Sequence, residues 1–226
     1  MQKIIFMPLC STVLCTVKSR FSGIFLFLLI FSSFIFGCSS EKKSVLIFED
    51  TFERAEIGKN YEVQGGDWRI ENGKLKSGTA KNRNLVLKLV DLPQDGIIEL
   101  TMKSHSDAVD VKFNLWGDGK IHDHGDGYTF ILGGWNNRIS VISKLHEHEK
   151  KRSEKRDAKL EKEKLYKIRV ERISNKISWF VNGGLFLEYN DETPLKVSEG
   201  FSKLSFANWK SDVEFDDLKI YALEEK

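Results

Sequence analysis

The sequence predicts an all-β domain made of two packed antiparallel sheets, and three observations lead to this prediction. From residue 44 onward, short segments are either apolar or alternate apolar and polar residues, as strands do. Gly, Asn and Asp punctuate these segments, and the periodicity of amphipathic helices is almost absent. About a dozen short strands separated by such turns are typical of a sandwich.

The strands are expected to follow one another at short intervals. The sequence predicts them at residues 45–49, 67–70, 74–77, 84–90, 96–103, 108–116, 128–133, 138–143, 165–171, 176–181, 185–189, 201–207 and 213–222. Residues that tolerate positive φ lie between several of them, such as Asn72-Gly73 and Asn182-Gly183. These turns predict hairpins, and therefore antiparallel neighbours.

The strand at 108–116 shows what each face of a sheet should carry. Val111, Phe113 and Leu115 share one face, which we expect to lie in the core. The other face is expected to meet solvent or a ligand, because it mixes charges, an amide and an indole: Asp110, Lys112, Asn114 and Trp116.

A charged insertion around 144–164 interrupts the strand pattern. It carries Lys150-Lys151-Arg152 and 161–164 (EKEK) among few apolar residues. It is either a long solvated hairpin tip or a short charged helix. Runs of mixed sign usually only solvate a surface, although this segment could also dock a protein partner.

Residues 1–37 have the composition of an export signal. They contain Lys3, Lys18 and Arg20 but no acidic residue, followed by an apolar run at 21–36 that is shorter than the roughly 20 residues of a membrane-spanning helix. The Gly37-Cys38 pair and the polar residues up to 43 resemble a bacterial lipoprotein lipobox. The resemblance implies cleavage before Cys38, lipidation of Cys38, a tether at 38–43 and a membrane-anchored lipoprotein that is periplasmic or on the cell surface. An uncleaved signal anchor is the alternative.

Charge and cysteine positions exclude several functions. Loss of the three basic residues of the signal changes the net charge from +2 to −1, which argues against nucleic-acid binding. The three cysteines are Cys10, Cys15 and Cys38. The domain at 44–226 therefore contains no disulfide, thiol nucleophile or cysteine-based zinc site.

Five segments of the chain together resemble the concanavalin A-like lectin/glucanase superfamily, in its laminin-G-like and glycoside-hydrolase-16-like branch. They are FEDTF (48–52), GDWRIENGKL (66–75), GYTF (127–130), ISWFVNG (177–183) and FDDLKI (215–220). The resemblance implies a two-sheet jelly roll with adjacent first and last strands and a concave face that meets carbohydrate. Fold alone does not determine activity.

Catalysis of the family 16 type is not expected. Those enzymes carry Glu-x-Asp-x-x-Glu on one strand, which places two carboxyls about 5 Å apart for retaining hydrolysis. The chain lacks this motif, and its nearest acids, Asp107 and Asp110, are three positions apart. The alternative is a divergent hydrolase that uses Asp110, His122 or Asp126.

Two kinds of metal site are candidates. The superfamily resemblance implies a structural calcium ion, for which Asp50 and Asp217 are the nominated ligands; the alternative is that these acids cap turns or pair with Lys219. Four histidines occur as two pairs at alternate positions. If the hairpin at 128–143 pairs residues whose numbers sum to 270, these four side chains converge on a transition metal: His122, His124, His146 and His148. Otherwise they are solvated loop residues.

The leading functional hypothesis is a non-catalytic, lectin-like domain that binds a glycan or another extracellular ligand. Sugars stack on aromatic rings and hydrogen-bond to neighbouring amides and acids. The residues that fit this pattern are Asn114, Trp116, Asp118, Trp135 and Asn136. Trp68, Trp179 and Trp209 lie in or near segments that determine the fold and are expected in the core.

Overall fold

The computed structural model describes residues 42–156 and 158–225. The predicted export signal and the lipidation at Cys38 lie outside the described residues. Within the described part of the chain, no helix has the length and apolar character needed to cross a membrane.

Nearly all regular structure is β, as the sequence predicts. The strands are β1 (Lys42–Asp50), β2 (Tyr61–Val63), β3 (Arg69–Glu71), β4 (Lys74–Ser77), β5 (Leu85–Leu87), β6 (Gly96–Ser104), β7 (Val111–Gly117), β8 (Tyr128–Gly133), β9 (Ile139–Lys144), β10 (Ser153–Arg156), β11 (Tyr166–Ile173), β12 (Lys176–Val181), β13 (Gly184–Asn190), β14 (Lys203–Ala207) and β15 (Val213–Glu225). One four-residue helical turn, α1 (Gly134–Asn137), follows β8, and a short 3-10 helix at Val197–Glu199 precedes β14.

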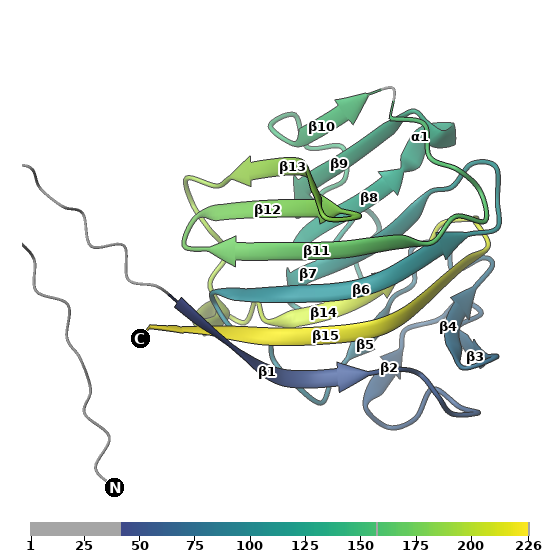
Figure 1. Ribbon diagram of the computed structural model, residues 1–226, viewed down its shortest axis with the longest axis horizontal. Coiled ribbons are helices and arrows are strands. Elements are labelled where there is room, and N and C mark those ends of the chain that lie inside the picture. Colours follow the sequence, from purple (N-terminus) through teal and green to yellow (C-terminus); the bar gives the residue numbers. More distant parts are fainter. Residues whose placement is uncertain (1–41, 157, 226) are drawn as a thin grey trace, which may run out of the picture. The chain divides into compact units, whose positions relative to one another are not determined.

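The strands form two antiparallel sheets, so the predicted jelly-roll sandwich is confirmed (Figure 1). The eight-stranded sheet has the order β13-β12-β11-β6-β15-β4-β3, with β1 also paired to β15. The seven-stranded sheet has the order β10-β9-β8-β7-β14-β5-β2. First and last strands are adjacent, as the superfamily resemblance implies, with Asp50 opposite Leu218.

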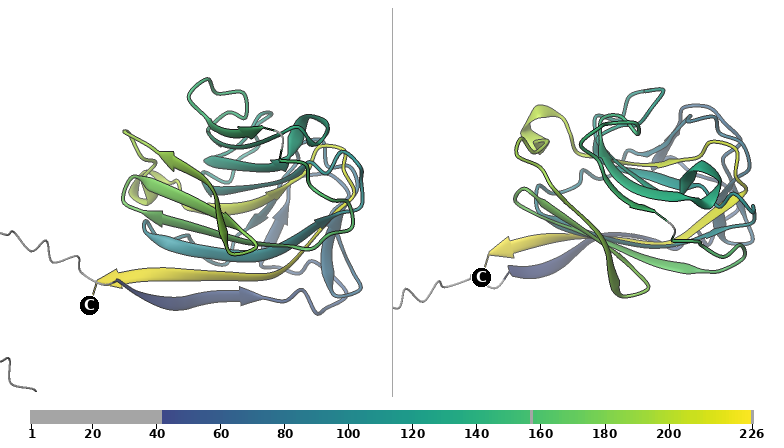
Figure 2. Two further views of the ribbon diagram at one scale, coloured as in Figure 1. Left: turned by 45° about the horizontal axis from the view of Figure 1, so that its top comes forward. Right: turned by 90° about the horizontal axis from the view of Figure 1, so that it is seen from above.

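The two sheets form two layers (Figure 2), and large aromatic side chains pack between them. Trp179 of β12 meets Phe113 and Phe130 edge-on, at centroid distances of 6.2 and 5.5 Å. Phe113 and Phe130 stack in parallel at 4.9 Å. Each such ring contributes about 1.5–3 kcal/mol by leaving water, so this contact is a main source of sandwich stability.

Most strand positions agree with the sequence-based expectation, and two strands were not predicted. Both β2 and β10 are short and lie at the edges of the seven-stranded sheet. The charged insertion at 144–164 forms a hairpin rather than a helix, because β10 pairs with β9.

Strand β7 confirms the predicted core face but breaks its alternation at the end. Val111, Phe113 and Leu115 are buried. Between Ser205 and Lys203 of β14, the pairing shifts from Asn114 to Gly117, so β7 has an extra residue there. Trp116 takes φ of 52° at this bulge and its side chain joins the core.

A long loop packs on part of the outer face of the seven-stranded sheet. In this loop, residues 118–127, the carbonyl of Gly119 accepts a hydrogen bond from Gln64 Nε2 at 2.7 Å. A Cβ on Gly125 would collide with Thr129 Oγ1, so the loop backbone lies directly on β8. Much of the sheet face that the sequence assigns to solvent or ligand is therefore buried.

Candidate functional site

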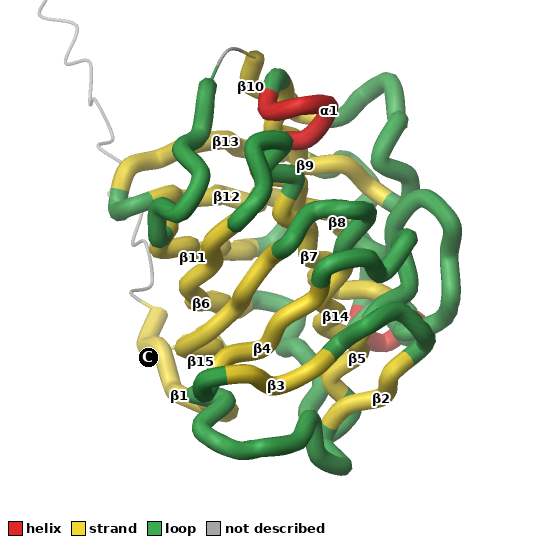
Figure 3. Tube along the Cα trace, turned by 90° about the vertical axis from the view of Figure 1, so that its right-hand side faces the viewer, coloured by secondary structure: helices red, strands yellow, loops and turns green. Residues whose placement is uncertain are grey.

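A groove of about 760 Å³ is lined by residues of β7, β8 and α1 and of the loops around them. Helical turn α1 lies at the end of the sandwich that faces the viewer in Figure 3. Loops gather at this end, so side chains distant in sequence meet there. Trp135 and Trp209 line the groove together with charged groups of β7 and of the loops.

Trp135 is positioned by α1, a turn with left-handed backbone. Trp135, Asn136 and Asn137 have φ of 52°, 60° and 58°. The Asn137 side chain fixes the turn, because its Nδ2 donates to the carbonyl of Leu160 at 2.7 Å and its Oδ1 accepts the Leu160 N–H at 3.0 Å. The Arg152 guanidinium lies 4.8 Å from the Trp135 ring centroid. Trp135 is half-buried, which leaves part of the indole available to the groove.

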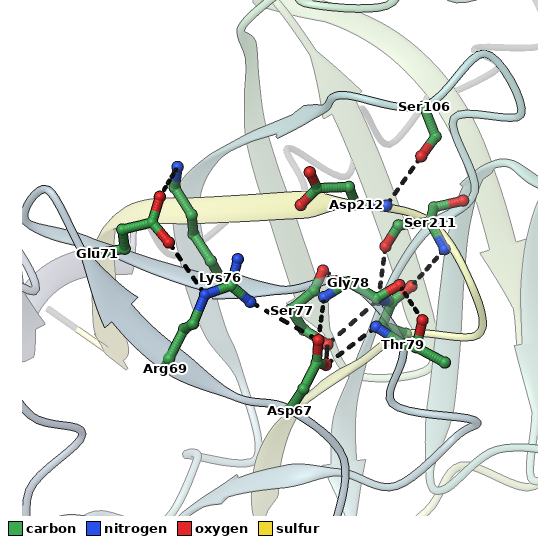
Figure 4. Close-up of polar contacts among 11 residues, drawn as sticks. Asp67, Arg69, Glu71, Lys76, Ser77, Gly78, Thr79, Ser106, Ser211 and Asp212 are labelled. Atoms are coloured by element: carbon green, nitrogen blue, oxygen red, sulfur yellow. Dashed lines mark hydrogen bonds and ion pairs between the residues drawn. The ribbon is translucent and has the colours of Figure 1, made fainter.

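Trp209 lies on the loop between β14 and β15. Its side chain is 43% exposed, so the expectation that it belongs to the core is wrong. The loop is fixed by Asn208, whose Nδ2 donates to the carbonyl of Ser211 at 2.7 Å, and by the Asp212 N–H, which donates to Ser106 Oγ at 2.9 Å (Figure 4). A rigid loop thus presents an exposed indole.

The loop after β4 is built around Asp67 (Figure 4). Its carboxylate accepts hydrogen bonds from Ser77 Oγ at 2.7 Å and from the N–H groups of Gly78 and Thr79 at 2.9 and 3.0 Å. The same loop then binds the Trp209 loop, because the Lys81 N–H donates to the Trp209 carbonyl at 3.0 Å.

Lys112 is the buried cation of the groove. Its ammonium donates to Glu147 at 2.5 Å and to Asn82 Oδ1 at 2.9 Å. Asp110 lines the same groove. Burial raises the pKa of Asp110 and the nearby Glu147 raises it further, while Lys112 opposes both effects. The groove therefore offers a lysine, a carboxyl that holds its proton more tightly than usual and an amide.

Three of the four paired histidines come together. The ring centroids of His124 and His146 are 4.6 Å apart, and His148 lies 5.8 Å from His124 and 5.5 Å from His146. His122 instead lies with Asp118, its Nε2 2.9 Å from Asp118 Oδ1.

The predicted register of the histidines is wrong for a physical reason. Strands β8 and β9 pair residues whose numbers sum to 272, from Ile131 with Val141 to Tyr128 with Lys144. Pairing ends there because Gly125 and Gly127 take φ of 128° and 64°, which turns the chain out of the sheet. His122 consequently does not oppose His148.

The predicted glycan-binding residues divide into two groups. Asn114 and Trp116 are buried: Asn114 donates to Ser205 Oγ at 3.0 Å, and the Trp116 indole donates to the Pro93 carbonyl at 2.7 Å. Neither can meet a ligand in this conformation, which corrects the prediction for these two. Asp118 is part of the covering loop and binds the Lys120 N–H at 2.8 Å.

Trp135 and Asn136 do line the groove. Sequence reasoning missed its other indole, Trp209, although the polar residues on both sides of it, Asn208 and Lys210, are the available sign of a loop.

The two acids nominated for calcium have different surroundings. Asp50 is buried, and its two carboxylate oxygens accept hydrogen bonds from the Arg54 guanidinium at 2.6 and 3.0 Å and from the Tyr61 hydroxyl at 2.7 Å. Asp217 is exposed and follows the residue that pairs with Lys74. With the Asp50 carboxylate occupied by an arginine, the arrangement does not favour calcium.

Solved structures with similar folds cover most of the domain at low identity. A protein of unknown function with a galectin-like fold from Bacillus subtilis has a TM-score of 0.62 and 12% identity, and covers 82% of this chain and 100% of its own. The carbohydrate-binding module CBM66 from Bacillus subtilis has a TM-score of 0.56 and 11% identity over 74% of this chain and 98% of its own. A laminarinase from Rhodothermus marinus has a TM-score of 0.56 and 12% identity over 81% and 99%. These similarities establish the fold.

No curated protein matches the chain by sequence. A family model described as "Farnesoic acid 0-methyl transferase" matches residues 79–216. The match includes every strand from β5 to β14 and all the groove segments between Lys81 and Ser211, more than half of the chain. By this match, the chain belongs to the family described as Farnesoic acid 0-methyl transferase.

Proposed function

We propose that this domain binds a glycan in the groove between Trp135 and Trp209. The observation that supports the proposal is the pair of indoles, one on each of two separately anchored loops, beside the polar groups of Asp110, Lys112 and Asn82. Pyranose rings stack their apolar face on an indole while their hydroxyls take directed hydrogen bonds. The arrangement supplies both kinds of contact.

The similar folds support this class of ligand by analogy. The Bacillus subtilis module is named as carbohydrate-binding, and the Rhodothermus marinus enzyme as a laminarinase. Analogy of fold alone does not transfer a ligand, so the proposal depends on the groove itself.

The family description suggests a different ligand, farnesoic acid. A farnesyl chain is wholly apolar and favours an apolar cavity, whereas this groove combines apolar groups such as Trp135, Trp209 and Ile131 with several charged side chains: Lys81, Asp110, Lys112, Asp123 and Lys210. We therefore favour a polar ligand, and farnesoic acid serves as the comparison ligand in the test.

A glycan array with the purified full-length chain tests the proposal, with uronic-acid glycans included because lysines line the groove. We expect binding by the wild type and at least a tenfold loss in Trp135→Ala and Trp209→Ala. Leu185→Ala is the matched control, since it removes an exposed apolar side chain of the other sheet. Absence of binding to all glycans, or saturable binding of farnesoic acid in their place, would contradict the proposal.

A second candidate function is glycoside hydrolysis, favoured by two of the carboxyls that line the groove. Asp110, with its raised pKa, has the character of a general acid, and Glu147 faces the same groove. Release of reducing sugar from a bound glycan would support it, provided that Asp110→Asn abolishes release while binding persists. Binding without release would leave the non-catalytic function.

We further propose that the domain acts outside the cytoplasm as a lipid-anchored protein. The support is the sequence of residues 1–43 alone, with Cys38 as the lipidated residue. We expect the wild type to partition with bacterial membranes and Cys38→Ser to move into the soluble fraction. Equal partition of both would contradict anchoring through Cys38.

A further inference from the structure

Two imidazoles and a carboxylate converge at the edge of the groove. His124, Glu147 and His148 each offer a ligand atom, and these atoms all lie within 4.8 Å of one another. Glu147 Oε1 is 3.9 Å from His124 Nδ1 and 3.5 Å from His148 Nε2. The three side chains lie in two separate chain segments, one on each side of the β8–β9 hairpin.

The spacing suits a shared ion better than direct hydrogen bonds. A hydrogen bond between nitrogen and oxygen is about 2.7–3.2 Å long. Ligands bound at about 2.0–2.1 Å in a tetrahedron lie about 3.4 Å apart. The two separations that involve Glu147, 3.5 and 3.9 Å, are close to this tetrahedral edge, and all three ligand atoms lie within 4.8 Å of one another.

The backbone holds the two segments in register. The Glu147 N–H donates to the His124 carbonyl at 2.7 Å, and the Leu145 N–H donates to the Gly127 carbonyl at 2.7 Å. These bonds fix the main chain from which all three side chains project. Little ordering is therefore needed when an ion binds.

A hydrogen bond from Lys112 also orients the Glu147 carboxylate. Its Oε2 accepts a hydrogen bond from the buried Lys112 at 2.5 Å, which leaves Oε1 for the imidazoles. Metal-ligating carboxylates are usually held by such an outer partner. The positive charge of Lys112 also repels a bound cation and therefore lowers the affinity of the site.

His146 supports this arrangement without being a ligand in it. Its Nδ1 accepts the His148 N–H at 3.0 Å, so the proton of a neutral ring is on Nε2. The hydrogen bond positions the backbone of His148.

We infer that His124, Glu147 and His148 form a binding site for a divalent transition-metal ion, with zinc as the ion that fits best. Two imidazoles and one carboxylate are a common ligand set for zinc sites that keep a fourth position open. All three residues line the groove, so the open position is available to water or to a groove ligand. This inference concerns the metal alone and does not depend on the glycan proposal.

A neighbouring group, Asp118, His122 and Asp126, provides an internal control. Its potential ligand atoms are equally close, but Asp126 already accepts the N–H groups of Asp118 and Gly119. His122 lies in the same loop as His124 but is not a proposed ligand, so its substitution is the control.

The test is competition for zinc between the full-length chain and a chromophoric chelator. The three cysteines are replaced by serine in every variant, because thiols bind zinc strongly. We expect one zinc per chain, at least tenfold weaker binding in His124→Ala and in His148→Ala, and unchanged binding in His122→Ala. Calcium should not compete, because it prefers oxygen ligands.

Circular dichroism of each variant confirms that the sandwich is folded, as expected for substitutions of exposed side chains. Zinc binding that is absent in the parent chain would overturn the inference. So would equal binding by the parent and a His124→Ala, His148→Ala double variant, or an equal loss in His122→Ala.

Discussion

Asp126 is a buried carboxyl that closes the loop over the seven-stranded sheet. Its two oxygens accept the N–H groups of Asp118 and Gly119 at 2.8 and 3.1 Å. Burial raises its pKa to about 6, and these two hydrogen bonds only partly offset that effect. The group therefore keeps its proton in the folded domain at pH values where a solvated aspartate has lost it.

This shift predicts a pH dependence of stability with a definite sign. Because the folded-state pKa is above the unfolded value of 3.8, the stabilising contribution of the protonated form is complete below about pH 4 and is lost as pH rises to about 6. We expect the stability of the wild type relative to Asp126→Asn to be about 1 kcal/mol greater at pH 5 than at pH 7. Urea unfolding at both pH values measures it, and a constant difference would contradict the assignment.

The same substitution should destabilise the domain far more at Trp116 than at Trp209. Trp116 is completely buried against Tyr128, with ring centroids 6.3 Å apart, whereas Trp209 is 43% exposed. We expect Trp116→Ala to lower the free energy of unfolding by about 3–5 kcal/mol and Trp209→Ala by about 0.5 kcal/mol or less. Thermal or urea unfolding distinguishes them; equal losses would place Trp116 outside the core.

The sequence predicted the environment of a residue correctly where the backbone is a regular strand, and failed where it is not. Val111, Phe113 and Leu115 were predictable because regular strands alternate. Trp116 was not, because a bulge reversed its direction. Asn114 was not, because the loop at 118–127, which directly follows its strand, folds back over the same face of the sheet. The sequence placed Trp135 and Asn136 at a turn, and the structure has a turn of left-handed backbone there.

At the scale of elements, the loop at 77–83 depends on a single side chain outside it. Asp67 accepts three hydrogen bonds from the beginning of this loop, and the loop then pairs with the Trp209 loop through Lys81 and Asn82. One wall of the groove is therefore fixed by residues that do not line it.

Substitution of Asp67 should loosen that wall while the sandwich stays folded. We expect Asp67→Ala to cost about 1 kcal/mol, because the lost hydrogen bonds are partly exposed, and to speed amide exchange at 77–83. Hydrogen–deuterium exchange measures this loop directly. Glu62→Ala, which removes an exposed pair with Lys88, should leave the exchange unchanged. Identical protection in both variants would contradict the role of Asp67.

Strands were predicted correctly where the alternation of apolar and polar residues runs over enough positions to be recognised. The hairpin at Gly134–Asn137 was located from its turn residues, but its register was wrong by two in the residue sum, and the histidine geometry changed with it. Strands β2 and β10 were missed because Tyr61–Val63 and Ser153–Arg156 are short edge segments with little apolar pattern. Three histidines converge nevertheless, through loop contacts that local sequence does not encode.

At the scale of the whole molecule, stability depends on packing between the two sheets. The described residues contain no cysteine, and Trp179 links β12 to Phe113 and Phe130 of the opposite sheet. Its indole Nε1 is buried without a hydrogen-bond partner, which carries an unfavourable desolvation cost of about 1–3 kcal/mol. This buried ring thus combines a large apolar contact with one unsatisfied donor.

These two effects can be separated by substitution. Trp179→Ala removes both ring and donor, and we expect a loss of about 3–5 kcal/mol, because the cavity between two sheets cannot collapse easily. Trp179→Phe keeps an aromatic ring against Phe113 and Phe130 and removes only the donor and some volume, so its net cost should be within about 1 kcal/mol. Urea unfolding of both variants gives the comparison. If Trp179→Phe were as costly as Trp179→Ala, the indole N–H would have to be satisfied in solution, and ring packing alone would not account for how the two sheets are held together.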